Sequence, residues 1–225
     1  MIRLFKRKKI DLPDFWKEYE KSFEEKIPND VNDVRFVVFD TETTGFDYFQ
    51  DRILCIGALI LVNWRIDVKK CFEIYIHQES YRKETAKIHG ILKHDKADRL
   101  TELKALELWL AYIGNAVLVA HHAHFDVTMI NRALARNSLP PMKNKVLDTG
   151  ILYKKTLLRS NLIQKKERYS LDDLATKFDI SKKDRHTALG DSYITSIAFI
   201  KILYKLKEKR NWTMQDLSAR RKWWK

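Results

Sequence analysis

Cysteine, glycine, proline and long apolar runs are all scarce in this sequence. Its 225 residues include two Cys, six Gly and four Pro, which excludes collagen-like, low-complexity and disulfide-stapled proteins. The longest apolar run, residues 53–62, is about half of the roughly 20 residues that cross a bilayer. No apolar stretch follows the basic N-terminus, so we expect no secretion signal, no membrane partner and a cytoplasmic protein. Cys55 and Cys71 lie in apolar runs without metal-ligand spacing, and we expect both in the core.

Positive charge is concentrated at the two ends of the chain. The net charge is +13, of which residues 1–10 carry +5 and residues 201–225 carry +7, leaving +1 for the body. Basic ends favour phosphate backbones or acidic partners, although they also serve simple solubility. The C-terminal end places Trp212, Trp223 and Trp224 among basic residues. This mixture favours base stacking with phosphate contact, or docking to a polymerase or replication-complex partner, over a frayed basic tail.

Hydrophobic patterning predicts an α/β domain with one mixed sheet. Short β-branched and apolar runs predict five strands, at residues 34–40, 53–62, 71–77, 116–120 and 146–148. Helical spacing and capping residues predict helices at 13–26, 102–113, 125–135, 150–158, 170–178 and 187–208. Because a strand meander precedes alternating strands and helices, we expect helices on both faces of the five-stranded sheet. The expected organisation is an N-terminal basic and helical extension (1–30), the domain (31–206) and a basic Trp-containing tail (207–225).

Two carboxylates stand at the end of the first apolar strand. Asp40 and Glu42 are two residues apart, so both side chains project from the same face of the sheet. Two like charges about 4 Å apart repel by about 4 kcal/mol at an effective dielectric of 20. A cation or a shared proton is needed to hold them together, and oxygen-only ligands favour Mg²⁺ or Mn²⁺ over zinc.

Two further segments carry candidate catalytic side chains. Asp126 lies where the fourth strand gives way to a helix, the position at which α/β folds place ligands. His186 precedes the last long helix, and Asp191 lies about one turn inside it, so a base and a carboxylate are close together. Taken alone, each of these residues is more typical of a structural role: a helix-dipole Asp or a structural His. Asp148, Asp172 and Asp173 are interpreted as helix caps.

Together these segments resemble the DnaQ-like family of 3′–5′ exonucleases, in the branch with three Asp, one Glu and one catalytic His (DEDDh). The resemblance rests on FDTETTG at 39–45, IHGI at 88–91, LVAHHAHFD at 118–126, SLDDLATKFDI at 170–180 and RHTALGD at 185–191. The resemblance covers about residues 34–205, and the motif sequences are similar to those of proofreading subunits of DNA polymerases. It implies a ribonuclease-H-like exonuclease fold.

The resemblance also implies a mechanism. Asp40, Glu42, Asp126 and Asp191 would hold two divalent cations, Mg²⁺ or Mn²⁺, whose charge of +4 balances that of the four carboxylates. His186 would be the general base for the water that attacks the terminal phosphodiester, which releases a nucleoside 5′-monophosphate.

The remaining expectations concern substrate contact. Residues expected at the terminal nucleotide are Thr41, Thr43, Thr44, Gly45, Phe46 and His89, with His121 beside the site. Core or turn roles are equally compatible with Gly45, Phe46 and His89. His122 stands where the family commonly has Asn, which alters substrate contact or metal affinity. The expected activity is exonucleolytic hydrolysis of DNA, at single-stranded or frayed 3′ ends. An RNA-trimming exonuclease and a catalytically silent nucleic-acid-binding module are the alternatives.

Overall fold

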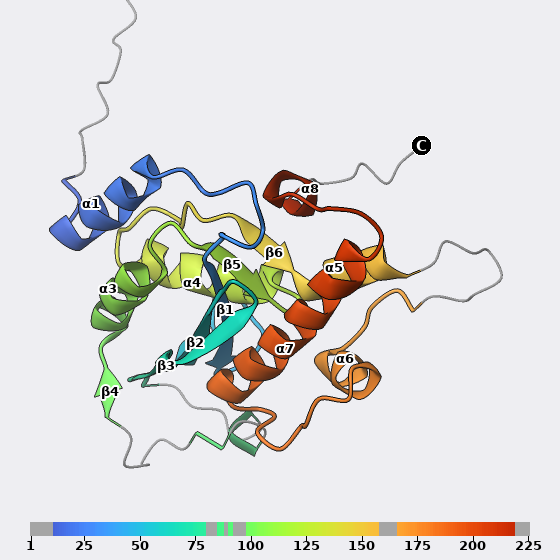
Figure 1. Ribbon diagram of the computed structural model, residues 1–225. Helices are drawn as coiled ribbons and strands as arrows, with labels where there is room; N and C mark the ends of the chain where they lie inside the picture. The colour runs from blue at the N-terminus through green and yellow to red at the C-terminus, as the bar shows by residue number, and fades with distance from the viewer. Residues whose placement is uncertain (1–10, 80–84, 88–89, 92–97, 158–165, 219–225) are drawn as a thin grey trace, which may run out of the picture.

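The structure is a computed structural model that describes residues 11–79, 85–87, 90–91, 98–157 and 166–218 (Figure 1). A single sheet runs through the middle of the chain, with helices on both sides. Within the described ranges, no helix has the length and apolar character needed to span a membrane. His89, the ten N-terminal residues and the tail residues 219–225 lie outside the described residues, together with the expectations that rest on them.

The sheet is mixed, as predicted, and contains six strands rather than five. The strands are β1 (Phe36–Thr43), β2 (Ile53–Val62), β3 (Arg65–Ile76), β4 (Arg99–Leu100), β5 (Val117–Ala120) and β6 (Val146–Asp148), in the spatial order β4-β3-β2-β1-β5-β6. The β1–β2 and β2–β3 pairs are antiparallel, and the other pairs are parallel. The additional strand, β4, has only two residues, which is too short to produce a hydrophobic period.

The turn between β2 and β3 has the geometry of a two-residue hairpin. Asn63 and Trp64 both have positive φ, at 48° and 63°, and Val62 pairs with Arg65. Such a turn matches the right-handed twist of the flanking strands. Strand β3 therefore begins directly after the turn, at Arg65, whereas the sequence predicts a strand that begins at residue 71. Cys55 is buried on β2, as expected. The expectation for Cys71 is wrong: it is exposed, within a stretch of β3 in which residues 68–71 are all exposed.

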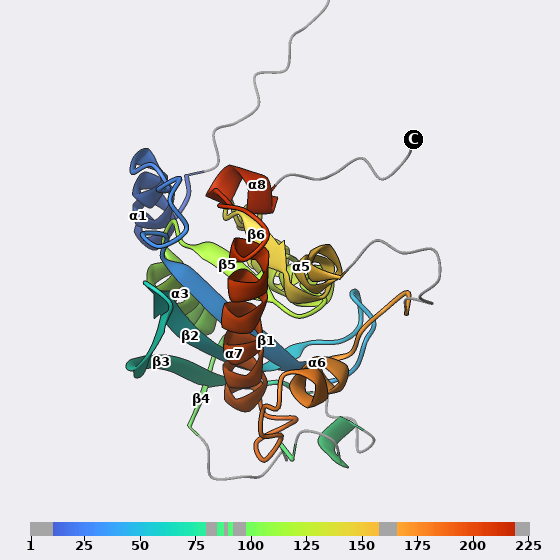
Figure 2. The same cartoon turned by 45° about the vertical axis from the view of Figure 1, so that its right-hand side comes forward.

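The helices form two layers, one on each face of the sheet. They are α1 (Asp14–Lys21), with a 3₁₀ turn at Ser22–Glu24, α3 (Glu102–Ile113), α4 (His124–Arg136), α5 (Thr149–Thr156), α6 (Leu171–Lys177), α7 (Ala188–Lys207) and α8 (Met214–Ser218). Figure 2 shows α7 crossing β1 and β2 on one side of the sheet, with α3 on the other side. Among the described residues, α8 and the helical residues 85–87 are absent from the helices that the sequence predicts.

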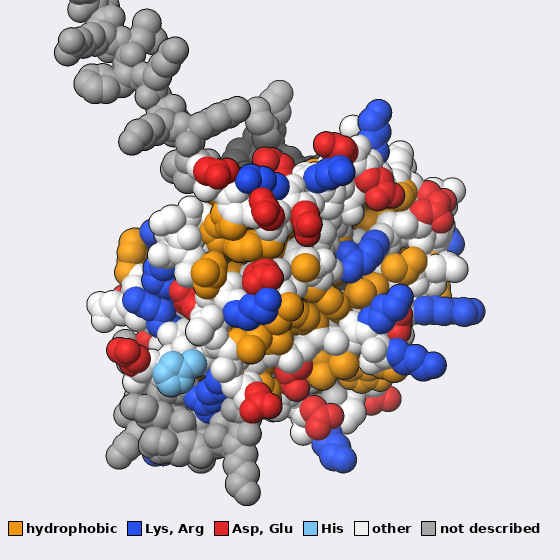
Figure 3. Space-filling view, turned by 90° about the vertical axis from the view of Figure 1, so that its left-hand side faces the viewer, with side chains coloured by type: hydrophobic (Ala, Val, Ile, Leu, Met, Phe, Trp, Pro, Cys, Tyr) orange, Lys and Arg blue, Asp and Glu red, His pale blue; other side chains and the backbone are white. Residues whose placement is uncertain are grey.

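Alternation along β1 assigns its residues to the two layers. Phe36 and Val38 pack in the core under α5, α6 and α7, whereas Val37 and Phe39 pack in the core under α1, α3 and α4. Asp40 and Glu42 continue the even-numbered series and therefore face α7. The first core also contains Met214 and Leu217 of α8, so the chain packs against the domain as far as residue 218. Figure 3 views the α1 and α3 side, where acidic and basic side chains are interspersed around hydrophobic ones.

Candidate active site

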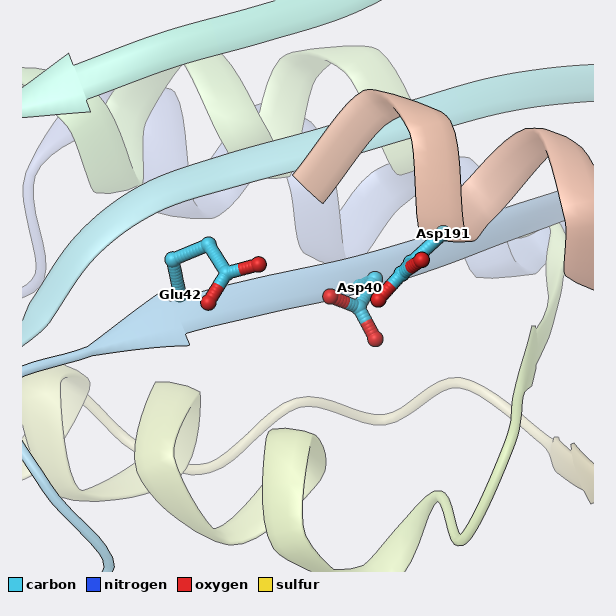
Figure 4. Close-up of side chains that lie close together, drawn as sticks. All are labelled: Asp40, Glu42 and Asp191. Atoms are coloured by element: carbon cyan, nitrogen blue, oxygen red, sulfur yellow. The ribbon is translucent and has the colours of Figure 1, made fainter. Parts of the chain in front are cut away.

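Three carboxylates from two elements meet beside the C-terminal half of β1. Asp40 and Glu42 lie on β1, and Asp191 comes from the first turn of α7 (Figure 4). One oxygen atom from each of the three carboxylates lies within 4.8 Å of the others. Asp40 and Glu42 therefore share one face of β1, as their two-residue spacing predicts, and the structure shows that this face is toward the helix that carries Asp191. This arrangement has the oxygen-only donor set of a hard divalent cation.

The start of α7 is held against the sheet by a close backbone contact. The helix begins after Thr187, whose side chain accepts a hydrogen bond from the Gly190 N–H at 3.1 Å. The Ser192 hydroxyl donates to the Gly57 carbonyl oxygen on β2 at 2.8 Å. A Cβ on Gly57 would fall inside van der Waals contact of the Ala188 and Leu189 backbone. Gly57 thus permits the approach that brings Asp191 to β1.

This contact leads to a prediction. The substitution Gly57→Ala should force α7 away from β2, lower the free energy of unfolding by about 2 kcal/mol through overpacking, and reduce activity with it. Thermal denaturation and hydrolysis rates of the same samples would measure both effects. Gly90→Ala is the comparison variant: none of the described atoms lies within 4 Å of a Cβ there, so any destabilisation that it shows arises from its positive φ and not from overpacking. Full activity and unchanged stability in Gly57→Ala would contradict the proposed tight approach.

Asp126 approaches Asp40 from the opposite face of the sheet. It lies in the first turn of α4 and is 4% exposed. Its Oδ1 accepts hydrogen bonds from the Thr41 amide at 3.0 Å and the Thr41 hydroxyl at 2.6 Å. Thr41, expected at the substrate, is therefore a buried partner of Asp126. The structure thus brings together Asp40, Glu42 and Asp191, whereas Asp126, the fourth predicted carboxylate, is hydrogen-bonded to Thr41, the residue next to Asp40 on β1.

Burial, together with the charges of neighbouring carboxylates, raises the pKa values of Asp40, Glu42 and Asp126. Burial raises the pKa of Asp40 well above its usual range, and the charges of Asp126, Asp191 and Glu42 raise it further. Burial is also the main cause for Glu42, whose pKa rises to about 8, and for Asp126, whose pKa rises to about 7. Ionising this group of side chains at neutral pH therefore requires compensating positive charge.

Arg185 supplies positive charge to this cluster, a role that sequence reasoning missed. Its Nη1 donates to Asp191 Oδ2, while its Nε and Nη2 donate to the two Asp172 oxygens at 3.0 Å each. The pairing with Asp172 is the first cause of a further rise in the pKa of Arg185, and it lowers the pKa of Asp172. Asp172 was expected to cap a helix, but the Ser170 and Asp173 side chains form the capping box of α6. The signal in the sequence was an arginine directly before His186.

His186 lies at the surface beside the carboxylates. Its side chain is exposed, its φ is 66°, and its N–H donates to Asp191 Oδ1 at 3.3 Å. The predicted base is therefore tied by its backbone to a predicted metal ligand, while its ring remains accessible. His121, in contrast, is half-buried between the Thr149 hydroxyl and the Tyr169 carbonyl, each 2.9 Å from a ring nitrogen. Burial lowers its pKa to about 4, so this ring is neutral at pH 7.

The position of His122 has a backbone explanation. Its φ is 57°, in the left-handed region that Asn, Asp and His tolerate better than most residues. The Asn common in the resembling family and the His in this chain both suit that conformation. Asp148 caps α5 as predicted, accepting from the Ile151 amide at 3.1 Å.

The loop after β1 carries the remaining predicted residues. The Thr43 hydroxyl donates to the Gly45 carbonyl at 2.7 Å, and the Thr44 hydroxyl donates to Asp51 at 2.8 Å. Thr43, Thr44 and Gly45 are all buried, and the two threonine hydroxyl groups make hydrogen bonds within the loop. Phe46 is 77% exposed next to them. Of this set, Phe46 presents its side chain outward.

Comparison with known proteins agrees with this geometry. Residues 37–199 match the exonuclease family of the RNase T type. The chain is 36% identical over 174 residues to a PolC-type DNA polymerase III of Caldanaerobacter subterraneus subsp. tengcongensis, and 32% identical over 187 residues to that of Staphylococcus epidermidis. These matches cover 77% and 80% of the chain, but the chain spans only 12% of each polymerase.

Solved structures share the fold at lower sequence identity. An Escherichia coli exonuclease I complex with single-stranded DNA superposes with a TM-score of 0.65 at 18% identity, covering 79% of this chain and 42% of that one. Exonuclease X bound to 5′-overhanging duplex DNA gives a TM-score of 0.59 at 23% identity, covering 82% and 97%. The predicted ribonuclease-H-like exonuclease fold is confirmed. The chain belongs to the exonuclease family, as a DnaQ-like 3′–5′ exonuclease.

Proposed function

We propose that this exonuclease hydrolyses DNA from single-stranded or frayed 3′ ends, with Mg²⁺ or Mn²⁺, and releases nucleoside 5′-monophosphates. The observation that carries the proposal is the meeting of Asp40, Glu42 and Asp191 oxygens within 4.8 Å. Asp126, fixed behind them by Thr41, completes the set that would hold two cations. Divalent cations bound there would neutralise the carboxylates and the charge that develops on the scissile phosphate.

The protein groups around the cluster have distinct proposed roles. The His186 ring, exposed beside Asp191, would accept the proton of the attacking water at a ring nitrogen. The Phe46 ring would pack against the terminal base. The backbone of the loop at Gly45, stabilised by the Thr43 and Thr44 hydroxyls, would lie along the terminal nucleotide.

Support for DNA as the substrate comes from the relatives. The matching polymerases are DNA polymerases, and the similar solved exonucleases were captured with DNA. We extend the proposal to a polymerase or replication-complex partner, contacted through the basic ends of the chain.

The test is a gel assay of DNA and RNA strands of matched sequence, labelled at the 5′ end, each incubated with Mg²⁺, Mn²⁺ or EDTA. We expect a ladder that shortens from the 3′ end with either metal, no degradation in EDTA, and faster degradation of DNA. Faster degradation of RNA would overturn the substrate assignment. Intact strands under all conditions, with binding retained, would instead identify a silent nucleic-acid-binding module.

A further inference from the structure

Two phenylalanine side chains stand out from the loop after β1. Phe46 is 77% exposed and Phe49 is 69% exposed, the two highest values among the large hydrophobic side chains that the structure describes as exposed. Burying a Phe side chain typically contributes substantial stability to a fold, so two such rings in solvent on one short loop call for a role outside the core.

The loop that carries these rings is fixed by its own hydrogen bonds. Asp51 is 2% exposed and accepts from the Thr44 hydroxyl at 2.8 Å and from the Asp47 amide at 2.9 Å. Asp47 in turn accepts from the Phe49 amide at 2.8 Å, and the Arg52 guanidinium donates to the Phe49 carbonyl at 2.9 Å. The exposure of Phe49 is therefore a property of an ordered loop.

Both exposed rings lie along α4. Phe46 contacts Phe125 with ring centroids 5.8 Å apart, and the Arg132 guanidinium lies 4.1 Å from the centroid of the Phe49 ring. Phe125 immediately precedes Asp126, and Arg132 follows Phe125 by seven residues, or about 10 Å along the helix axis. The rings thus form a strip that leads away from the carboxylate cluster.

We propose that Phe49 and Arg132 form a subsite for the bases and phosphates upstream of the 3′-terminal nucleotide of a single strand. The inference rests on the proposed function, because it takes the terminal nucleotide to lie at Phe46. An exposed ring offers a face for base stacking, and the adjacent guanidinium offers charge for a phosphate. A strip of about 10 Å corresponds to about three nucleotides at the 3.4 Å rise of one stacked strand.

The charges around Phe49 favour a nucleic acid over a protein partner. Arg132 is exposed and stacked on the ring, and the Arg52 guanidinium lies on the same loop. Asp47 and Asp51 each lie two residues from Phe49 in sequence, and both carboxylates accept hydrogen bonds from groups of their own loop. A strand that stacks on Phe49 thus meets a cation at the ring, the pairing that single-strand binding sites use.

The test is binding of fluorescein-labelled thymidine strands of two and eight nucleotides, measured by fluorescence anisotropy in EDTA to prevent hydrolysis. Phe49→Ala should weaken binding of the eight-nucleotide strand about tenfold, the loss of one stacking contact, and Arg132→Ala should weaken it through the loss of one phosphate contact. Because the two-nucleotide strand does not reach the subsite, the ratio of the affinity for eight nucleotides to the affinity for two should fall by the same factor as the affinity for eight. The matched controls are Tyr204→Ala, an exposed ring whose centroid lies 4.8 Å from that of Trp64, and Arg65→Ala, an exposed arginine on β3; both should bind the two strands as the wild type does.

The outcomes separate this inference from the proposed function. Unchanged eight-nucleotide binding in Phe49→Ala and Arg132→Ala, or equal losses for both lengths, would overturn the subsite even if the wild type degrades DNA with Mg²⁺. Length-dependent losses in a protein that degrades no strand would support the subsite and overturn the exonuclease proposal. If Phe49→Ala dissociates a dimer in sedimentation and leaves strand binding intact, the strip is a protein interface and the inference is wrong.

Discussion

Replacing Asp40 by Asn should lower the rate of strand hydrolysis by about a thousandfold while making the metal-free protein more stable. The rate loss is expected because bound cations contribute several kcal/mol to catalysis and Asp40 is central to their site. The gain in stability is expected because burial and three neighbouring carboxylates raise the pKa of Asp40. An amide at this position avoids the free-energy cost of ionisation.

The pH dependence of that gain follows from the direction of the shift. Wild-type Asp40 binds its proton more tightly in the folded than in the unfolded state, so wild-type stability falls as the pH rises above the ordinary Asp value. The difference in melting temperature between Asp40→Asn and wild type should therefore be largest at high pH and should vanish in acid. Differential scanning calorimetry in EDTA from pH 4 to pH 9 would measure it.

The matched control for this experiment is Asp14→Asn, a change at an exposed carboxylate on α1. It should leave both the hydrolysis rate and the pH dependence of stability as in wild type. Asp191→Asn should lose activity as Asp40→Asn does, since carboxylate oxygens of Asp40 and Asp191 lie within 4.8 Å of each other at the proposed cation site. Near-wild-type hydrolysis in either variant would rule out the metal assignment.

The part of the site that lies on regular elements was predictable from sequence. On any strand, the two-residue spacing of Asp40 and Glu42 places both side chains on one face. The identity of the helix over that face comes from the fold, in which Phe36 and Val38 of the same face pack against α7. The six-stranded sheet differs from prediction by β4, whose two residues are too few to carry a pattern.

The interactions that the sequence did not predict depend on loops and on neighbouring helices. The ion pair of Arg185 with Asp172 joins a loop to the start of α6, 13 residues earlier, and no local pattern relates the two. The stacking of Arg132 on Phe49 likewise joins α4 to the loop after β1. Sequence periodicity reports which face a side chain takes on its own element, whereas such contacts require the packing of two elements.

Arg185→Ala should destabilise the metal-free protein by about 3 kcal/mol, because it leaves the Asp191 carboxylate unpaired in a buried position. The Arg185 and Asp191 side chains are 16% and 9% exposed, so water replaces little of the lost interaction. Urea denaturation in EDTA would measure the loss. Added Mg²⁺ should reduce the difference from wild type, since a cation at the carboxylates supplies the missing positive charge.

A double-mutant cycle distinguishes this charge effect from simple loss of packing. Arg185→Ala combined with Asp191→Ala should recover most of the stability lost in Arg185→Ala, because no unpaired carboxylate then remains at Asp191. Lys166→Ala is the control, because its ion pair with Asp173 lies at the surface, where water screens the charges, and its loss should change the stability little. Equal destabilisation in the single and double variants would mean that Arg185 stabilises the fold through packing and through Asp172, and that the carboxylate cluster does not depend on its charge.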